Sequence, residues 1–216
     1  RQSERNSQIL ARLDEHLGAG GIQPAPVLST IPAARADEAR PEIESAFRSA
    51  SGEVLEWPQT LDDGQWIPRA ELELLEATIS SSDRSAVMLL GAPGSGKSAL
   101  MARLARQSIN AGYSVLAIKA DQLPEDILSL KDLDQWLELE FPLVRALELV
   151  AVHRKTVLLI DQLDALSELI DLRTGRLSAL VALIRRAAEI PNLHVICSCR
   201  SFERRYDTRL SRIDAE

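Results

Sequence analysis

Residues 91–98 have the composition and spacing of a phosphate-binding loop. They are Gly91, Ala92, Pro93, Gly94, Ser95, Gly96, Lys97 and Ser98. This order satisfies the P-loop pattern G-x-x-x-x-G-K-[ST]. Its glycines let backbone N–H groups curl around a phosphate chain that any Cβ atom would crowd. We expect Lys97 to reach the β- and γ-phosphates of a nucleotide, Ser98 to bind Mg²⁺ at the start of a helix, and Ala99 to complete the contact.

A second candidate follows the apolar run at 156–160, which ends in Asp161. A buried strand that ends in aspartate is typical of a Walker B element, whose carboxylate meets Mg²⁺ through water. Asp164 has two compatible interpretations. It orients or deprotonates an attacking water, or it caps a helix that begins at Ala165, with Glu168 completing a capping box.

The third candidate is Arg200, which follows an apolar segment at 194–198. Parallel α/β sheets bind ligands at the carboxyl ends of their strands, so a guanidinium there can sense or stabilise the charge of a γ-phosphate. The alternative is a solvated loop arginine. Cys197 and Cys199 point to the same side of this segment, where buried reduced thiols are a better interpretation than a redox pair.

These side chains need a sheet whose strands end at one edge. Short apolar runs at 87–90, 114–120, 156–160 and 194–198 alternate with segments of helical periodicity. This alternation predicts a three-layer α/β fold with a central parallel sheet. Glycines and Pro24, Pro26, Pro32 and Pro41 interrupt the chain between residues 18 and 50. That segment is either a tether or a partly helical arm that packs on the following domain.

The expected division of the chain into domains follows from this change in composition. Residues 3–17 have the periodicity of an amphipathic helix. We expect residues 1–60 to hold this helix and a Pro/Ala-rich linker, as the end of an N-terminal effector region. Residues 61–216 are then expected to form the P-loop domain, without further C-terminal modules.

Composition excludes several classes of function. The 216 residues carry a formal net charge of −7, which argues against a generally basic surface for nucleic acid. No apolar run approaches the ~18 residues that span a bilayer, and no leader opens the chain. The two cysteines are too few for a disulfide framework. We expect a cytoplasmic protein with no membrane partner.

At three further places the chain resembles the STAND class of P-loop ATPases, signal-transduction ATPases that include the NACHT and apoptotic-ATPase branches. Residues 66–72, WIPRAEL, are similar to the hydrophobic-Gly-Arg-x-x-Glu-Leu segment that lies along the adenine, with Pro68 in place of glycine. Residues 158–165, LLIDQLDA, resemble four hydrophobic residues followed by Asp-Gly-Leu-Asp-Glu, with Gln162 replacing the glycine. Residues 195–200, VICSCR, are similar to the strand whose final arginine senses the γ-phosphate.

This resemblance implies a nucleotide-controlled switch. The chain is expected to bind ATP or ADP with Mg²⁺, to hydrolyse ATP slowly, to self-associate or engage a partner, and to control a linked effector in immune or stress signalling. Trp66, Ile67, Pro68 and Arg69 are its implied adenine contacts. Lys97, Asp161, Asp164 and Arg200 are its implied catalytic set. The resemblance also implies that the strand at 194–198 lies between the P-loop strand and the Walker B strand.

Other functions share parts of this pattern. A DNA-dependent AAA+ ATPase has the same motifs, but usually carries Asp-Glu where this chain has Asp161 and Gln162, and the acidic charge also argues against it. A small-molecule kinase usually opens with its P-loop strand, whereas a long segment precedes it here. No Asn-Lys-x-Asp guanine-reading motif is present, which disfavours a GTPase. A nucleotide-free scaffold leaves the three motifs unexplained.

Overall fold

The computed structural model describes residues 33–59, 66–166, 175–206, 210 and 213. The amphipathic helix expected at 3–17 lies outside these residues. By its contacts the chain divides into two units, Arg1–Arg35 and Ala36–Glu216. The following description concerns the second unit.

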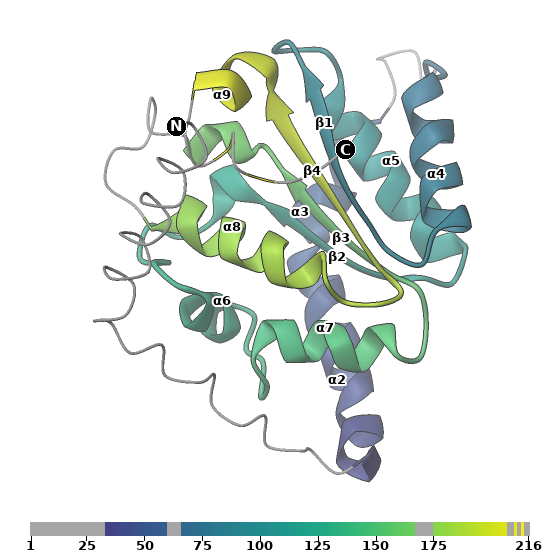
Figure 1. Ribbon diagram of the computed structural model, residues 1–216, viewed down its shortest axis with the longest axis vertical. Coiled ribbons are helices and arrows are strands. Elements are labelled where there is room, and N and C mark those ends of the chain that lie inside the picture. The colour runs from purple at the N-terminus through teal and green to yellow at the C-terminus, as the bar shows by residue number, and fades with distance from the viewer. Residues whose placement is uncertain (1–32, 60–65, 167–174, 207–209, 211–212, 214–216) are drawn as a thin grey trace, which may run out of the picture. The chain divides into compact units, whose positions relative to one another are not determined.

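A four-stranded parallel sheet forms the centre of the unit (Figure 1). Its strands are β1 (Ser85–Gly91), β2 (Ser114–Lys119), β3 (Thr156–Asp161) and β4 (Leu193–Arg200). Their spatial order is β1-β4-β3-β2, and all three neighbouring pairs are parallel. The predicted three-layer α/β architecture is therefore confirmed, as is the placement of the strand that carries Arg200 between the P-loop strand and the Walker B strand.

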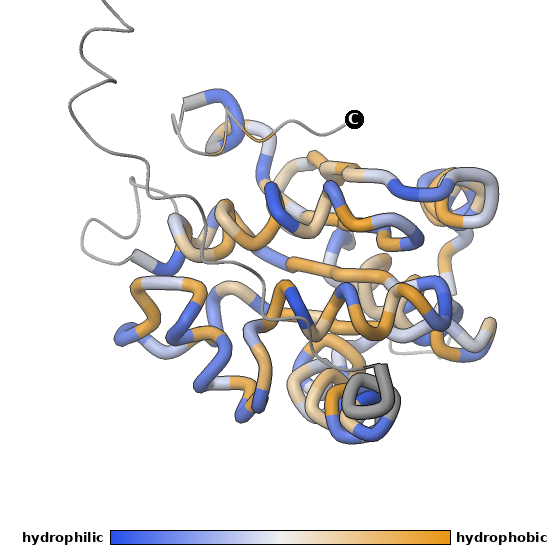
Figure 2. The backbone as a smooth tube through the Cα atoms, turned by 60° about the horizontal axis from the view of Figure 1, so that its bottom comes forward, coloured by the Kyte–Doolittle hydropathy of each residue, from blue (hydrophilic) through white to orange (hydrophobic). Residues whose placement is uncertain are grey.

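Helices cover both faces of the sheet. One layer holds α3 (Gly52–Leu55), α4 (Ala70–Ser81) and α5 (Lys97–Asn110), and the other holds α6 (Leu130–Trp136), α7 (Leu143–Ala151) and α8 (Arg176–Ala187). Figure 2 shows the apolar strands between these helical layers. Shorter elements are η1 (Ala120–Gln122), η2 (Leu163–Leu166) and α9 (Ser201–Tyr206). Among the helices of the described ranges, none is long and apolar enough to cross a membrane.

The helical periodicity of the sequence corresponds to buried faces. Leu72, Leu75 and Ile79 of α4 are all buried and join the core cluster between the helices and the sheet. Gly112 follows α5 with a φ of 83°, so a left-handed glycine lies just after the end of this helix. Ile109, near the end of α5, is by contrast 42% exposed.

Helix α2 (Ala33–Ala50) occupies part of the segment for which the sequence allowed two interpretations, a tether or a partly helical arm. Its residues Ile43 and Phe47 are buried, as is Val54 of α3, which belongs to the core cluster. Residues 38–55 therefore form a helical arm that packs on the domain, and the tether interpretation does not hold for them. We call residues 36–59 the N-terminal arm. The expected division of the chain at residues 60 and 61 stays a prediction.

Candidate functional site

The P-loop connects β1 to α5 and has the backbone that its glycines predict. Gly94 and Gly96 adopt φ values of 71° and 80°, a region that L side chains rarely occupy. A Cβ atom added at Gly91 would lie 2.7 Å from the hydroxyl oxygen of Ser95. The loop is thus a backbone cradle for a phosphate group, in which a larger residue at Gly91 would displace Ser95, while the φ of Gly94 and Gly96 favours glycine there.

Lys97 lies inside this cradle. Its ammonium group donates hydrogen bonds to the carbonyl oxygens of Gly91, at 3.1 Å, and of Ala92, at 3.0 Å. These contacts fold the side chain back across the loop, where phosphate oxygens can replace the carbonyls as partners. Because α5 begins at Lys97, the free N–H groups of its first turn add a favourable field for an anion.

Asp161 ends β3 as a buried carboxylate that is only 1% exposed. The hydroxyl of Ser198, on the neighbouring strand β4, donates a hydrogen bond to its Oδ1. The same hydroxyl oxygen accepts a hydrogen bond of 2.9 Å from the backbone N–H of Gln162. Ser198 therefore fixes both the Walker B carboxylate and the turn that follows it. The sequence placed Ser198 on a strand, but gave no sign of this bond.

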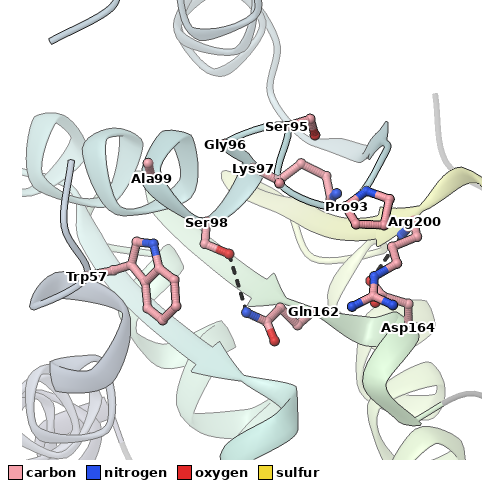
Figure 3. A pocket seen from close by; sticks show the side chains of 11 residues that line it. Trp57, Pro93, Ser95, Gly96, Lys97, Ser98, Ala99, Gln162, Asp164 and Arg200 are labelled. Carbon is pink, nitrogen blue, oxygen red and sulfur yellow. Dashed lines mark hydrogen bonds and ion pairs between the residues drawn. The ribbon is translucent and has the colours of Figure 1, made fainter. Parts of the chain in front are cut away.

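Gln162 has a left-handed backbone, with a φ of 59°. This conformation explains why glycine is common at its position in the motif that the chain resembles. Its side-chain amide reaches toward α5, where Nε2 lies 3.4 Å from the hydroxyl oxygen of Ser98 (Figure 3). The two expected magnesium residues, Ser98 and Asp161, are thus linked through a residue adjacent to one of them.

Asp164 and Arg200 form an ion pair at the carboxyl end of the sheet. The guanidinium Nε of Arg200 lies 3.0 Å from Oδ2 of Asp164, and the backbone N–H of Arg200 donates to Oδ1 at 3.0 Å. Asp164 is 3% exposed, whereas the Arg200 side chain is 43% exposed. Arg200 is thus the last residue of β4 rather than a loop residue, and its partly exposed guanidinium is paired with a buried carboxylate.

The alternative role of Asp164 as the N-cap of a helix beginning at Ala165 stays a prediction, because residues 167–174 lie outside the described residues. Asp164 lies within the short 3₁₀ turn η2, and its carboxylate faces β4. Two donors from Arg200 hold both of its oxygens. Glu168, the expected second half of a capping box, lies outside the described residues.

One pocket brings most of these groups together. Its lining residues are Trp57, Pro93, Gly94, Ser95, Gly96, Lys97, Ser98, Ala99, Gln162, Asp164 and Arg200. Figure 3 shows Arg200 and Asp164 on one side of Ser98 and Trp57 on the other. Trp57 is the member that sequence reasoning missed, because it belongs to a segment that was assigned to a linker.

The segment 66–69 lies against the P-loop from outside this pocket. The guanidinium of Arg69 donates to the carbonyl oxygen of Ser95 at 2.8 Å, and it would lie 3.0 Å from a Cβ atom at Gly96. Trp66 is half-buried, with the guanidinium of Arg103 on α5 at 5.4 Å from its ring. Trp66, Ile67 and Pro68 do not line the pocket, and their contact with adenine stays a prediction.

The cysteines of β4 take no part in the site. Cys197 and Cys199 are both buried and free of disulfide bonds, as the sequence predicted. Burial raises the pKa of the Cys197 thiol far above its usual value, and the neighbouring Cys199 adds to this shift. Cys197 therefore stays protonated, which excludes it as a thiolate nucleophile.

Comparison with known proteins identifies the family. Residues 87–216 match the family model described as "ATPase family associated with various cellular activities (AAA)". No curated protein sequence matches the chain significantly.

Solved structures give distant likenesses. The chain is similar to PCH-2 of C. elegans, with 19% identity and a TM-score of 0.35 over 83% of this chain and 41% of that chain. A structure of Drosophila ORC bound to GC-rich DNA and Cdc6 is similar at 14% identity and a TM-score of 0.35, over 82% of this chain and 54% of that chain. The chain therefore spans about half or less of these proteins. On the family match, which covers more than half of its residues, the chain belongs to the AAA family of ATPases.

Proposed function

We propose that this AAA domain is a switch of the STAND type that binds Mg-ATP, hydrolyses it slowly and is reset as the ADP form. The observation that supports this proposal most is the pair formed by Asp164 and Arg200 beside the P-loop. The STAND resemblance implies an acidic residue three positions after the Walker B aspartate and an arginine at the end of the neighbouring strand, and here the two side chains are paired.

Each residue has a distinct part in this proposal. Lys97 and the loop amides hold the phosphates, and the first turn of α5 adds its dipole. Ser98 and Asp161 hold Mg²⁺, which neutralises charge on the phosphate oxygens when it is bound. Asp164 orients the attacking water, and Arg200 contacts the γ-phosphate. The cradle at Gly91 and the buried carboxylate of Asp161 fit such a ligand.

We expect slow hydrolysis because of the side chains of Gln162 and Asp164, which line the pocket where an attacking water would need a base. Gln162, adjacent to the Walker B aspartate, has a neutral amide that cannot accept a proton from water. The carboxylate of Asp164 already accepts hydrogen bonds from the guanidinium and the backbone N–H of Arg200. The pocket is therefore better suited to hold a nucleotide for long periods than to turn it over quickly.

The first experiment is to denature the purified chain and to identify any released nucleotide by chromatography, with its ratio to protein. Near-stoichiometric ADP or ATP supports the proposal, and Lys97→Ala is expected to leave the site empty. The Kd for Mg-ATP and a single-turnover hydrolysis rate then separate a switch from a fast ATPase. Turnover at several molecules per second by the isolated chain would contradict the proposal.

The wider role proposed for the whole protein is control of an effector linked to residues 1–60, through ATP-dependent self-association. Light scattering of the chain with Mg²⁺ and a non-hydrolysable ATP analogue tests the self-association. A mass that stays monomeric with the analogue bound counts against it.

A second candidate is a DNA-dependent AAA ATPase, and membership of the AAA family favours it. The comparisons give no support to the expectation that nucleic acid is excluded as a partner. Salt-sensitive binding of duplex DNA that stimulates ATP hydrolysis would establish this function. If the nucleotide-bound chain does not bind DNA at low ionic strength, the DNA-dependent ATPase is excluded and the switch remains as the proposal.

A further inference from the structure

The N-terminal arm covers the outer edge of β2. The hydroxyl oxygen of Ser51 accepts a hydrogen bond of 2.8 Å from the backbone N–H of Ala117 on this strand, and donates one of 2.6 Å to the carbonyl of Phe47. Glu44 adds contacts of 3.3 Å to the Ser114 hydroxyl and of 3.4 Å to Arg154. The arm thus supplies a partner for an edge strand that would otherwise leave a buried N–H unpaired.

The end of the same arm reaches the nucleotide pocket. The backbone N–H of Trp57 donates to the carbonyl of Val54 at 3.2 Å, which continues the turn of α3. The side chain of Arg106 on α5 donates to the carbonyl of Leu55 at 3.1 Å. These bonds fix the backbone on both sides of residue 56, and Figure 3 shows the Trp57 ring close to Ser98 and Ala99.

Lys119 holds the indole from the sheet. Its ammonium lies 4.5 Å from the centroid of the Trp57 ring, while the Lys119 side chain is only 7% exposed and is paired with Asp121 at 3.1 Å. Lys119 is also the register partner of Asp161 in the β2–β3 pair. The ring is therefore anchored beside the Walker B strand end, and Trp57 still keeps 37% of its surface exposed.

We propose that Trp57 contacts the bound nucleotide, and that the arm is docked more firmly on β2 when the nucleotide is present. This inference rests on the proposed function, because it needs a nucleotide in the pocket. An indole with one face held by a buried cation offers a rigid aromatic surface at little cost in conformational entropy. Apolar or ring atoms of the nucleotide that pass Ser98 and Ala99 meet this surface.

Thermodynamic linkage extends the contact to the arm. If the nucleotide binds more tightly when Trp57 is in place, nucleotide binding must favour the docked arm by the same factor. The bond between Ser51 and the Ala117 N–H then becomes harder to open. The nucleotide state is in this way passed to the chain that precedes the domain, with no movement of the sheet.

Binding measurements on the full chain test the contact. We expect Trp57→Ala to weaken binding of Mg-ADP and of a non-hydrolysable Mg-ATP analogue by about tenfold, the effect of about 1.4 kcal/mol. Trp57→Phe keeps an aromatic surface and is expected to stay within about threefold of the parent. The matched control is Leu74→Ala, which removes an apolar side chain that is 68% exposed on α4 and does not line the pocket.

Hydrogen exchange of the Ala117 amide tests the link to the arm, because its bond to Ser51 reports docking directly. Saturation with Mg-ADP is expected to slow this exchange in the parent chain and to have less effect in Trp57→Ala. Equal Kd values for the parent and Trp57→Ala, or an unchanged Ala117 exchange rate in the nucleotide-bound parent, would overturn the inference alone. Absence of nucleotide binding by the parent, as in Lys97→Ala, would overturn the proposed function with it.

Discussion

The two edge strands of the described sheet, β1 and β2, differ in how far their residues are buried. All six residues of β2 are buried, and the arm covers its outer edge. On β1, only Met88 is buried, and Leu90 is 47% exposed. Both strands are apolar and both begin with serine, so the strand sequences themselves do not explain the difference.

This difference indicates that the arm is part of the folded domain, because it covers the edge strand β2. An uncovered apolar edge strand is open to pairing with other chains, and proteins generally protect such edges. Here the protection of β2 comes from residues that precede the domain expected from the sequence. The arm that protects the edge also brings Trp57 to the nucleotide, so one segment serves both stability and the site.

The largest effect expected is on the covered edge. Phe47 of α2 is 1% exposed, and Phe47→Ala leaves a cavity that typically costs about 3–5 kcal/mol. Leu90→Ala on β1, the other edge strand of the described sheet, is expected to cost below about 1 kcal/mol, since about half of its surface already meets solvent. Denaturant unfolding of both variants measures the two costs. Equal costs would mean that the arm is not part of the cooperative unit.

The next effect concerns pH and a histidine beside β1. His194 of β4 is the register partner of Ser85, whose hydroxyl lies 2.9 Å from its Nδ1, and its Nε2 is buried with no hydrogen-bond partner among the described residues. Burial and, to a smaller extent, the charge of Lys155 lower the pKa of His194 to about 4, while Asp83 acts in the opposite direction. The neutral imidazole is therefore the form that the fold accepts.

The sign of the pH dependence follows from this shift. The pKa of His194 in the unfolded chain is about 6.5, so below that pH the unfolded state binds a proton that the folded state refuses. The contribution of His194 to stability is thus complete above about pH 6.5 and is lost as the pH falls toward 4. Its slope is at most about 1.4 kcal/mol per pH unit. Urea unfolding of the parent and of His194→Gln between these pH values isolates this slope, and parallel curves would exclude it.

A smaller effect is expected from the single hydroxyl that links the arm to β2. Ser51→Ala leaves the buried N–H of Ala117 without the partner that it has at 2.8 Å, a loss that typically costs about 1–3 kcal/mol. Ser82→Ala is the matched control, because the Ser82 hydroxyl donates only to a carbonyl oxygen at the half-buried end of α4. Similar unfolding midpoints for the two variants would show that the arm does not depend on this bond.

Most of the fold could be predicted from the sequence, because apolar runs and helical periodicity are local signals. The strands at 87–90 and 194–198 were each found to within a few residues of β1 and β4. The arm was harder to predict, since Pro41 lies inside α2 and few of its residues are strongly apolar. Its buried positions Ile43 and Phe47 do have helical spacing, yet what they pack against depends on the tertiary fold.

In the candidate site too, local features could be predicted from the sequence and contacts between distant elements could not. Residues whose role depends on backbone conformation, such as Gly94 and Gly96, are visible in the motif itself. The partners supplied by other elements are not, because Ser198 meets Asp161 across two strands and Trp57 reaches Ser98 from the arm. The sequence also could not determine that Arg200 holds both oxygens of Asp164.

The smallest effect expected lies between the two edges, where β3 ends. Gln162 has a φ of 59°, a conformation that costs an L-residue roughly 1 kcal/mol and glycine almost nothing. Gln162→Gly is therefore expected to be more stable than Gln162→Ala by about 1 kcal/mol, although both lose the same side-chain contact with Ser98. Comparing glycine with alanine cancels that lost contact, so the difference in unfolding free energy reports the backbone alone. If alanine proved as stable as glycine, the turn after Asp161 would have to relax without the left-handed residue. The bond from its N–H to Ser198 would then no longer define how the Walker B carboxylate is held.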